Sequence, residues 1–140
     1  MVLAYLARWS GPVNESDDPY NPNSGISPER LTPIKHVQEA VFIPTRESPL
    51  DNDQFKQAIM NYGAVCTAMC WDNSYYNPAT YSYYLNKYQS LNHAISLVGW
   101  DDNYDKNNFR IPATGNGAFI VRNSWGTDWA DQGYYYVSYY

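Results

Sequence analysis

Four short segments with strand-like composition recur in the second half of the chain, at residues 64–71, 93–100, 118–123 and 134–140. Valine, isoleucine, tyrosine and tryptophan favour extended backbone, whereas the Gly, Asn and Asp residues between the segments favour turns. The 9 prolines and 8 glycines are spread along the chain and argue against long helices. The pattern therefore predicts an antiparallel sheet with few helices.

One helix is expected directly before this sheet, over residues 51–62. Its first residues, Asp51-Asn52-Asp53-Gln54, fit a capping box, in which a carboxylate caps the helix and a Gln three positions later reaches back. Apolar side chains at helical spacing form one stripe along the helix. The stripe consists of Phe55, Ala58, Ile59 and Tyr62. A glycine at position 63 then ends the helix.

The first fifty residues carry weaker patterns. Residues 2–9 have apolar side chains at helical spacing and stop at a Ser-Gly-Pro sequence. Because nothing caps the start of this helix, we expect it to begin before Met1. Residues 10–33 are predicted to be irregular and exposed, and residues 37–43 are predicted to form a strand. Residues 134–140 end within a predicted strand, so we expect both chain ends to interrupt an element.

Charge and hydropathy argue against two kinds of partner. The net charge is -5, and no cluster of Lys or Arg occurs that could bind phosphates, so nucleic acid is not an expected partner. No apolar run approaches the roughly 20 residues that span a bilayer. Residues 1–8 also lack the basic start and the cleavage site of a signal peptide. We expect no membrane span, and no export signal is visible.

The chain has two cysteines, Cys66 and Cys70. Four positions apart on a strand, they would point to the same face and lie too far apart to bridge easily. We expect two buried thiols, and one disulfide remains the alternative.

The segment Asp101–Asp105 resembles the start of a calcium-binding loop. However, Lys106 stands where such a loop needs glycine, and Pro112 stands where the bidentate Glu belongs. A solvated loop is the favoured interpretation, and a weak calcium site stays open.

Two segments carry residues that could take part in catalysis. The segment Leu91–Trp100 places His93 at the start of an alternating strand, and the segment Arg122–Tyr134 places Asn123 at the end of another. Adjacent strands would bring the two side chains within hydrogen-bond reach. An imidazole acts as base and acid towards a thiol if it is held in one tautomer, and an Asn carbonyl can hold it without adding charge. A tryptophan such as Trp125 would shield that hydrogen bond from water.

Both segments resemble the C-terminal active-site blocks of the papain (C1) family of cysteine peptidases. His93 matches the catalytic histidine of that family, Asn123 its orienting asparagine, and Trp125 the tryptophan that covers the asparagine. The match covers residues 51–140 most strongly. Residues 9–13, Trp-Ser-Gly-Pro-Val, and the long loops are more similar to prokaryotic members than to plant or lysosomal ones.

The resemblance implies a fold and an activity. The fold would be α+β, the sheet-rich half of the papain-like fold, with a twisted antiparallel half-barrel and one or two helices. Residues 1–140 would then form a single partial domain. The activity would be peptide-bond hydrolysis through a Cys-His-Asn site, on peptide or protein substrates, without metal or cofactor. The resemblance also places Ala68, Asn92 and Ala94 near the pocket for the second substrate residue, and implies a secreted or cell-envelope parent protein.

One element of the family pattern is missing from residues 1–140. The nucleophilic cysteine of papain-like enzymes lies on a helix N-terminus about 130–150 residues before the histidine, and only 92 residues precede His93. Neither Cys66 nor Cys70 fits that role, because an apolar strand offers no helix terminus to lower a thiol pKa. We therefore expect the nucleophile on a separate half and the isolated chain to be inactive. A non-catalytic homologue that binds without cutting, and an interaction module that joins a separate Cys-bearing half, remain alternatives.

Overall fold

The chain divides into two compact units in the computed structural model, which describes residues 2–19, 21 and 23–140. The first unit is Met1–Phe42 and the second is Ile43–Tyr140. A single partial domain over residues 1–140 stays a prediction. None of the helices in the described ranges has the length and apolarity that crossing a bilayer requires.

Among its described residues the first unit contains one helix, α1 (Val2–Ala7), followed by irregular backbone with isolated turns. The rings of Trp9 and His36 stack with centroids 4.5 Å apart, and the Ile34 N–H donates to the Pro12 carbonyl. The expected start of the helix before Met1 lies outside the described residues. The predicted strand at residues 37–43 is wrong: this segment belongs to no strand, because no second strand pairs with it in the described chain.

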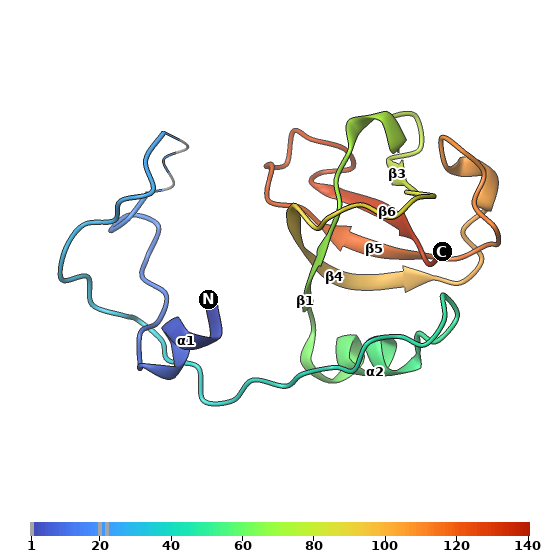
Figure 1. The fold of residues 1–140 in the computed structure, drawn as a ribbon. Helices are drawn as coiled ribbons and strands as arrows, with labels where there is room; N and C mark the ends of the chain where they lie inside the picture. Colours follow the sequence, from blue (N-terminus) through green and yellow to red (C-terminus); the bar gives the residue numbers. More distant parts are fainter. Residues whose placement is uncertain (1, 20, 22) are drawn as a thin grey trace. The chain divides into compact units, whose positions relative to one another are not determined.

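The second unit is a twisted sheet with one helix beside it (Figure 1). Its elements in chain order are α2 (Asp53–Tyr62), β1 (Val65–Met69), η1 (Asn73–Tyr75), β2 (Tyr76–Asn77), β3 (Ser82–Tyr83), β4 (His93–Asp101), η2 (Lys106–Asn108), β5 (Ala118–Arg122) and β6 (Tyr134–Ser138). The six strands follow the order β1-β4-β5-β6-β3-β2. The four predicted strands are thus β1, β4, β5 and β6, and they pair antiparallel as expected.

Two short strands complete the sheet in a way that the sequence pattern does not show. β3 pairs parallel with β6 and antiparallel with β2. Hydrogen bonds from the hydroxyls of Thr80 and Ser82 to the Asn108 carbonyl, at 2.6 and 2.8 Å, hold β3 in place. The architecture is therefore the sheet-rich α+β arrangement that was predicted, with a mixed sheet in place of a purely antiparallel one.

Helix α2 starts differently from the prediction. The N-cap is Asn52, and its side chain makes no capping hydrogen bond. The Asp51 carboxylate accepts from the Glu47 N–H instead, at 3.0 Å, so the predicted capping box is wrong. The side-chain oxygen Oδ1 of Asn52 accepts from the Arg46 guanidinium at 2.8 Å, which ties the helix start to the preceding loop. Tyr62, predicted to lie on the buried stripe, is 69% exposed.

The core lies between α2 and the sheet and within the curve of the sheet. Alternation along β4 buries Ile95 and Leu97 and leaves Ala94 exposed, as strand geometry requires. The main cluster of buried side chains consists of Ile59, Tyr83, Ile95, Leu97, Phe119, Val121, Tyr135 and Tyr139. A second cluster joins Tyr104, Phe109 and Ala113 of the segment between β4 and β5 to Ala118 at the start of β5. The buried tyrosines explain how a chain of low mean hydropathy forms a core.

The two cysteines are both free, and only one is buried. Cys66 is exposed because it shares with Ala68 the face of β1 that the core does not cover. Cys70 lies beyond the end of β1, so the alternation of the strand no longer sets its direction, and it is buried. The prediction of two buried thiols is therefore wrong for Cys66.

Candidate active site

His93 and Asn123 meet at one end of the sheet. His93 is the first residue of β4, and Asn123 directly follows β5, the antiparallel neighbour of β4. The Asn123 N–H donates to the Gly133 carbonyl at 2.9 Å, which fixes the backbone where β5 ends. The distance between His93 Nε2 and Asn123 Oδ1 is 2.9 Å, within hydrogen-bond range.

A second hydrogen bond defines the orientation of the Asn123 amide. The backbone N–H of Ser124 points at the same atom, Asn123 Oδ1, at 2.9 Å. A backbone N–H can only donate, so this atom is the carbonyl oxygen, and an oxygen of this kind can only accept. His93 Nε2 must therefore carry the proton, and a neutral ring then has its lone pair on Nδ1. No hydrogen bond occupies Nδ1 within the described chain.

Asn123 is 5% exposed, and its Nδ2 has no hydrogen-bond acceptor in the described part of the chain. A buried amide hydrogen that keeps no acceptor costs about 1–3 kcal/mol, so Asn123 Nδ2 favours an added acceptor at this site. Trp125, two residues further on, lies beside the histidine: the ring centroids of Trp125 and His93 are 5.0 Å apart. Trp125 itself is 42% exposed.

A cluster of aromatic side chains surrounds these residues. We call it the aromatic cluster, and it consists of Trp71, Tyr76, Tyr83, Trp125, Trp129 and Tyr135. Trp71 lies at its centre, with its ring in contact with each of the other five and with His93. Burial raises the pKa of Tyr83 to about 12 and also raises the pKa of Tyr135, so both hydroxyls stay neutral.

The three predicted substrate-pocket residues lie close together on the surface. Ala68 and Ala94 are direct cross-strand partners on β1 and β4, and Asn92 precedes β4. All three are exposed. The Asn92 side chain accepts from the Trp71 N–H at 2.7 Å and donates to the Trp71 carbonyl at 3.0 Å.

Neither cysteine lies at the histidine. Met69 is the cross-strand partner of His93, and Cys66 is opposite Ser96, about 10 Å further along the strand. The Cys70 thiol donates to Gln89 Oε1, with Sγ and Oε1 3.0 Å apart. Neither thiol therefore makes a hydrogen bond with His93 or Asn123 in the described chain.

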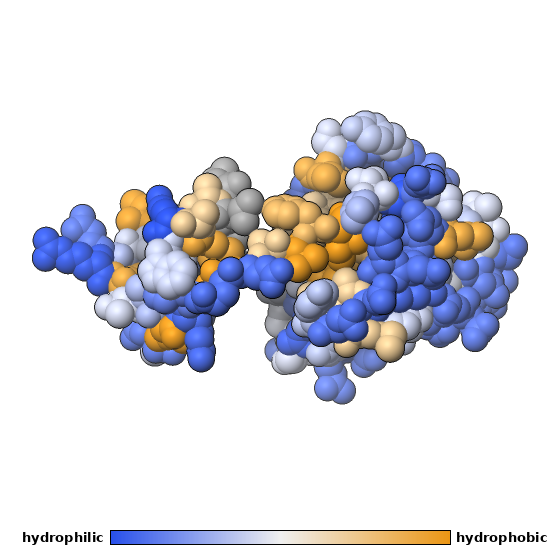
Figure 2. Space-filling view, turned by 90° about the horizontal axis from the view of Figure 1, so that it is seen from below, coloured by the Kyte–Doolittle hydropathy of each residue, from blue (hydrophilic) through white to orange (hydrophobic). Residues whose placement is uncertain are grey.

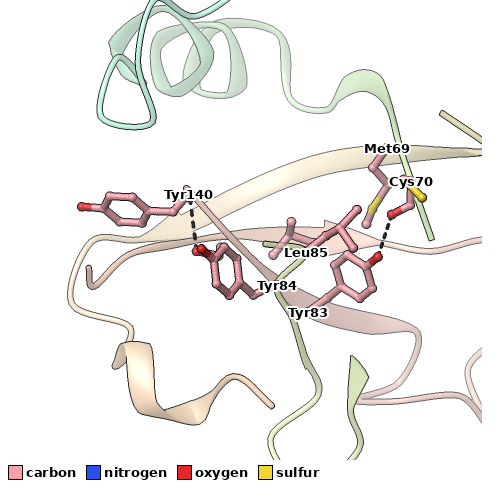
Figure 3. A pocket seen from close by; sticks show the side chains of 8 residues that line it. Met69, Cys70, Tyr83, Tyr84, Leu85 and Tyr140 are labelled. Carbon is pink, nitrogen blue, oxygen red and sulfur yellow. Dashed lines mark hydrogen bonds between the residues drawn. The ribbon is translucent and has the colours of Figure 1, made fainter. Parts of the chain in front are cut away.

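A small pocket of about 140 Å³ is lined by residues other than His93 and Asn123 (Figure 3). Its lining includes Met69, Cys70, Tyr83, Tyr84, Leu85 and Tyr140. None of the predicted substrate-pocket residues contributes to it. The Tyr83 hydroxyl crosses it to donate to the Cys70 carbonyl at 2.8 Å, so the pocket belongs to the packing between β3 and the end of β1.

The acidic loop after β4 folds back on its own backbone. Asp101 Oδ1 accepts from the Asn103 N–H, and Asp105 Oδ1 accepts from the Asn107 N–H, both at 2.8 Å. Across the described ranges, no three His, Cys, Asp or Glu side chains gather in a way that could hold a metal ion.

Sequence reasoning did not identify Trp71 as part of this site. The available signal was its position at the end of the predicted strand 64–71, beside the strand that begins with His93. Trp129 and Tyr83 were also missed, because their contacts join segments far apart in the sequence.

Comparisons with known proteins agree with this geometry. The model for papain family cysteine proteases matches residues 1–139. Vignain from Vigna mungo is 28% identical over 137 residues, which are 95% of this chain and 34% of vignain. A viral cathepsin of Choristoneura fumiferana defective polyhedrosis virus is 32% identical over 94% of this chain and 36% of its own length. The chain thus spans about a third of the length of these relatives.

Two solved structures show the same backbone arrangement. The cysteine protease and lectin-like domains of Cwp84, a surface layer associated protein of Clostridium difficile, have a TM-score of 0.84 and 34% identity, over 98% of this chain and 31% of theirs. Bromelain from Ananas comosus has a TM-score of 0.66 and 21% identity, over 96% of this chain and 57% of its own. The bacterial protein is the more similar of the two, as the sequence predicts.

Proposed function

Since this chain belongs to the papain family of cysteine proteases, we propose that it supplies the histidine and asparagine of a Cys-His-Asn site for peptide-bond hydrolysis. The nucleophilic cysteine would come from a part outside residues 1–140. The observation that carries this proposal is the hydrogen bond between His93 and Asn123, in which the Ser124 N–H fixes the amide and leaves His93 Nδ1 open.

The proposed reaction is acyl transfer to a thiol. The sulfur of the cysteine attacks the scissile carbonyl carbon, and His93 Nδ1 holds the proton taken from the thiol. When the C–N bond breaks, this proton goes to the leaving amine, and a thioester remains. Water then attacks the thioester, Nδ1 takes a proton from the water, and the thiolate leaves as the acid product forms. Asn123 keeps the ring in the Nε2–H tautomer throughout.

The partner of this chain would be the Cys-bearing half of the protease. Exposed apolar side chains support a covering partner: Leu50, Met60 and Leu91 are each at least 65% exposed. Apolar side chains also gather on the side of the second unit that carries α2 (Figure 2). Exposed apolar surface of this kind favours association. The unpaired Asn123 Nδ2 is a further polar group that a partner or water could satisfy.

The substrate would be a peptide that lies across Ala68, Asn92 and Ala94. Small side chains at the two alanines leave room for the second residue of the substrate. Replacing Ala68 by Phe should raise KM for peptides with a bulky residue at that position and leave KM for a small residue there less affected.

We place the parent protein outside the cytoplasm, in the secreted or cell-envelope fraction. The clostridial protein Cwp84, a surface layer associated protein, supports this location.

The test is a chimera in which residues 1–140 replace the matching third of the clostridial protease. A fluorogenic peptide should be cleaved by the chimera and not by the isolated chain. His93→Ala should lower kcat/KM of the chimera by about 10²- to 10⁴-fold, the usual contribution of a general acid–base group. Asn123→Ala should cause a smaller loss, mainly in kcat.

A surface variant serves as the control. Tyr88 is 97% exposed, so Tyr88→Ala should leave the rate unchanged. A folded chimera that binds peptide and never cleaves it would favour a binding module. Cleavage by the isolated 140-residue chain that depends on His93 would contradict the need for a separate cysteine.

A further inference from the structure

Trp71 holds a central position next to the histidine, outside the two segments, Leu91–Trp100 and Arg122–Tyr134, that carry His93 and Asn123. We propose that Trp71 is a positioning residue, which fixes Trp125 and the His93 ring and so protects the hydrogen bond to Asn123. The inference rests on the proposed function of the His93–Asn123 pair and adds a residue to it.

The first argument is contact. The Trp71 indole meets the His93 ring edge-on with centroids 6.0 Å apart, and meets Trp125 edge-on with centroids 4.9 Å apart. Trp125 in turn lies 5.0 Å from His93, so the three rings contact one another pairwise. Edge-on aromatic pairs at these distances are attractive beyond simple burial. The imidazole is therefore bordered by two indoles.

The second argument is that Trp71 is itself immobilised. Its ring stacks on Tyr83 with centroids 4.8 Å apart and planes 16° from parallel. The Tyr83 hydroxyl donates to the carbonyl of Cys70 at 2.8 Å and accepts from the N–H of Asp72 at 3.2 Å. Tyr83 thus binds the backbone on both sides of Trp71 while its ring supports the indole. Tyr83 is 1% exposed, so the packing around it holds its ring in place against the indole.

The third argument is the connection of Trp71 to the residue before His93. Both backbone groups of Trp71 bond to the Asn92 side chain, and the Asn92 N–H donates to the Met69 carbonyl at 3.1 Å. The Trp71 indole N–H donates to Asn73 Oδ1 at 2.8 Å, which fixes the rotation of the ring. Hence the backbone of the segment 69–71 and the start of β4 form one bonded unit.

The physical consequence concerns Trp125. It lies beyond the end of β5, is 42% exposed, and is followed by a glycine with φ of 87°, so the local backbone alone does not hold its ring. Contacts with Trp71 and with Trp129, 4.9 and 4.8 Å between centroids, hold it against His93. Without the Trp71 indole, the Trp125 ring would gain freedom and water would reach the His93–Asn123 hydrogen bond, which water weakens.

The experiment measures the His93 imidazole in the full 140-residue chain by nitrogen-15 NMR. Long-range proton–nitrogen correlations report which ring nitrogen carries the proton, and the exchange rate of the Nε2–H proton reports access of water. In the unmodified chain we expect the Nε2–H tautomer. Trp71→Leu should mix the tautomers and raise the exchange rate about tenfold, the factor that corresponds to loss of one typical hydrogen bond.

Tyr76→Leu is the matched control, because Tyr76 contacts Trp71 and Trp129 from the cluster and has no ring contact with His93 in the described chain. It should leave the tautomer and exchange rate of His93 as in the unmodified chain. Trp71→Phe keeps a smaller ring and should give an intermediate exchange rate. If Trp71→Leu fails to fold, Trp71→Phe decides the question. An exchange rate in the folded Trp71 variants equal to that of the control would overturn the inference.

Asn123→Ala separates this inference from the proposed function. If that variant leaves the tautomer unchanged, the proposed role of Asn123 fails. If Asn123→Ala mixes the tautomers and the Trp71 variants do not, only the role of Trp71 fails.

Discussion

Removing the hydroxyl of Tyr83 should destabilise the second unit more than any other Tyr→Phe change on β3 or β6. In Tyr83→Phe the buried Cys70 carbonyl and the Asp72 N–H both lose their hydrogen-bond partner. A buried group left without a partner costs about 1–3 kcal/mol. Cys70 is buried, so we expect the full cost at its carbonyl. The Asp72 N–H makes the longer bond and lies closer to solvent, so we expect a smaller cost there. We therefore expect a loss of about 2–3 kcal/mol in the free energy of unfolding.

Urea unfolding followed by tryptophan fluorescence measures this loss. Trp71, Trp100, Trp125 and Trp129 all lie in the second unit, so the signal comes mainly from the sheet. With a slope of about 1–2 kcal/mol per M urea for a unit of this size, the midpoint should fall by about 1–3 M.

The control for this measurement is Tyr136→Phe. Tyr136 pairs with Ser82 across β3 and β6, and its hydroxyl makes no hydrogen bond with any described residue. Its change in stability should stay within about 0.5 kcal/mol. If Tyr83→Phe and Tyr136→Phe shift the midpoint equally, the support that Tyr83 gives to Trp71 is refuted.

Three further predictions concern thiols and titration. A thiol reagent should modify the exposed Cys66 rapidly and the buried Cys70 only after unfolding; equal rates would contradict the assigned burial. The hydrogen bond from Lys56 lowers the pKa of Asp102 below its ordinary value of 3.8. The ionised carboxylate therefore adds a small amount to the free energy of unfolding above that pH, and this amount is lost on acidification. The difference in Tm between the unmodified chain and Asp102→Asn should vanish in acid. Burial raises the pKa of Tyr83 from 10.0 to about 12. The neutral Tyr83 hydroxyl therefore makes its full contribution to the free energy of unfolding below pH 10, and this contribution is lost as the pH rises through 12. Tyrosinate absorbance should then show Tyr83 ionising together with unfolding, and independent titration near pH 10 would count against its burial.

Local periodicity was enough to predict the long strands and the position of His93 and Asn123. Alternation assigns His93 to the start of β4 and Asn123 to the end of β5, and neighbouring antiparallel strands are the simplest pairing. The same rule failed at residues 37–43, which have strand-like composition and no strand to pair with. It also failed for Cys66, since alternation alone does not say which face of β1 the core covers.

Contacts between distant segments account for what the sequence did not reveal. β3 has two residues, too few for any periodic signal, and exists because Ser82 and Thr80 bond to Asn108 and because β6 lies alongside. The aromatic cluster arises in the same way. Its members come from four separate stretches of the chain, so no local pattern joins Trp71 to Trp125.

The tautomer of His93 limits how any nucleophile can approach this chain. Since Nε2 donates to Asn123, a thiol must exchange its proton at Nδ1, the one remaining ring nitrogen. His93 lies opposite Met69 where β1 and β4 meet, and the exposed pair Ala68 and Ala94 follows directly on the same strands. A sulfur at Nδ1 would therefore stand at the same end of the sheet as the surface proposed for the substrate. A single partner that covers this end could deliver the thiol, complete the substrate cleft and exclude water from the hydrogen bond, which is why the proposed Cys-bearing half has to cover this end of the sheet.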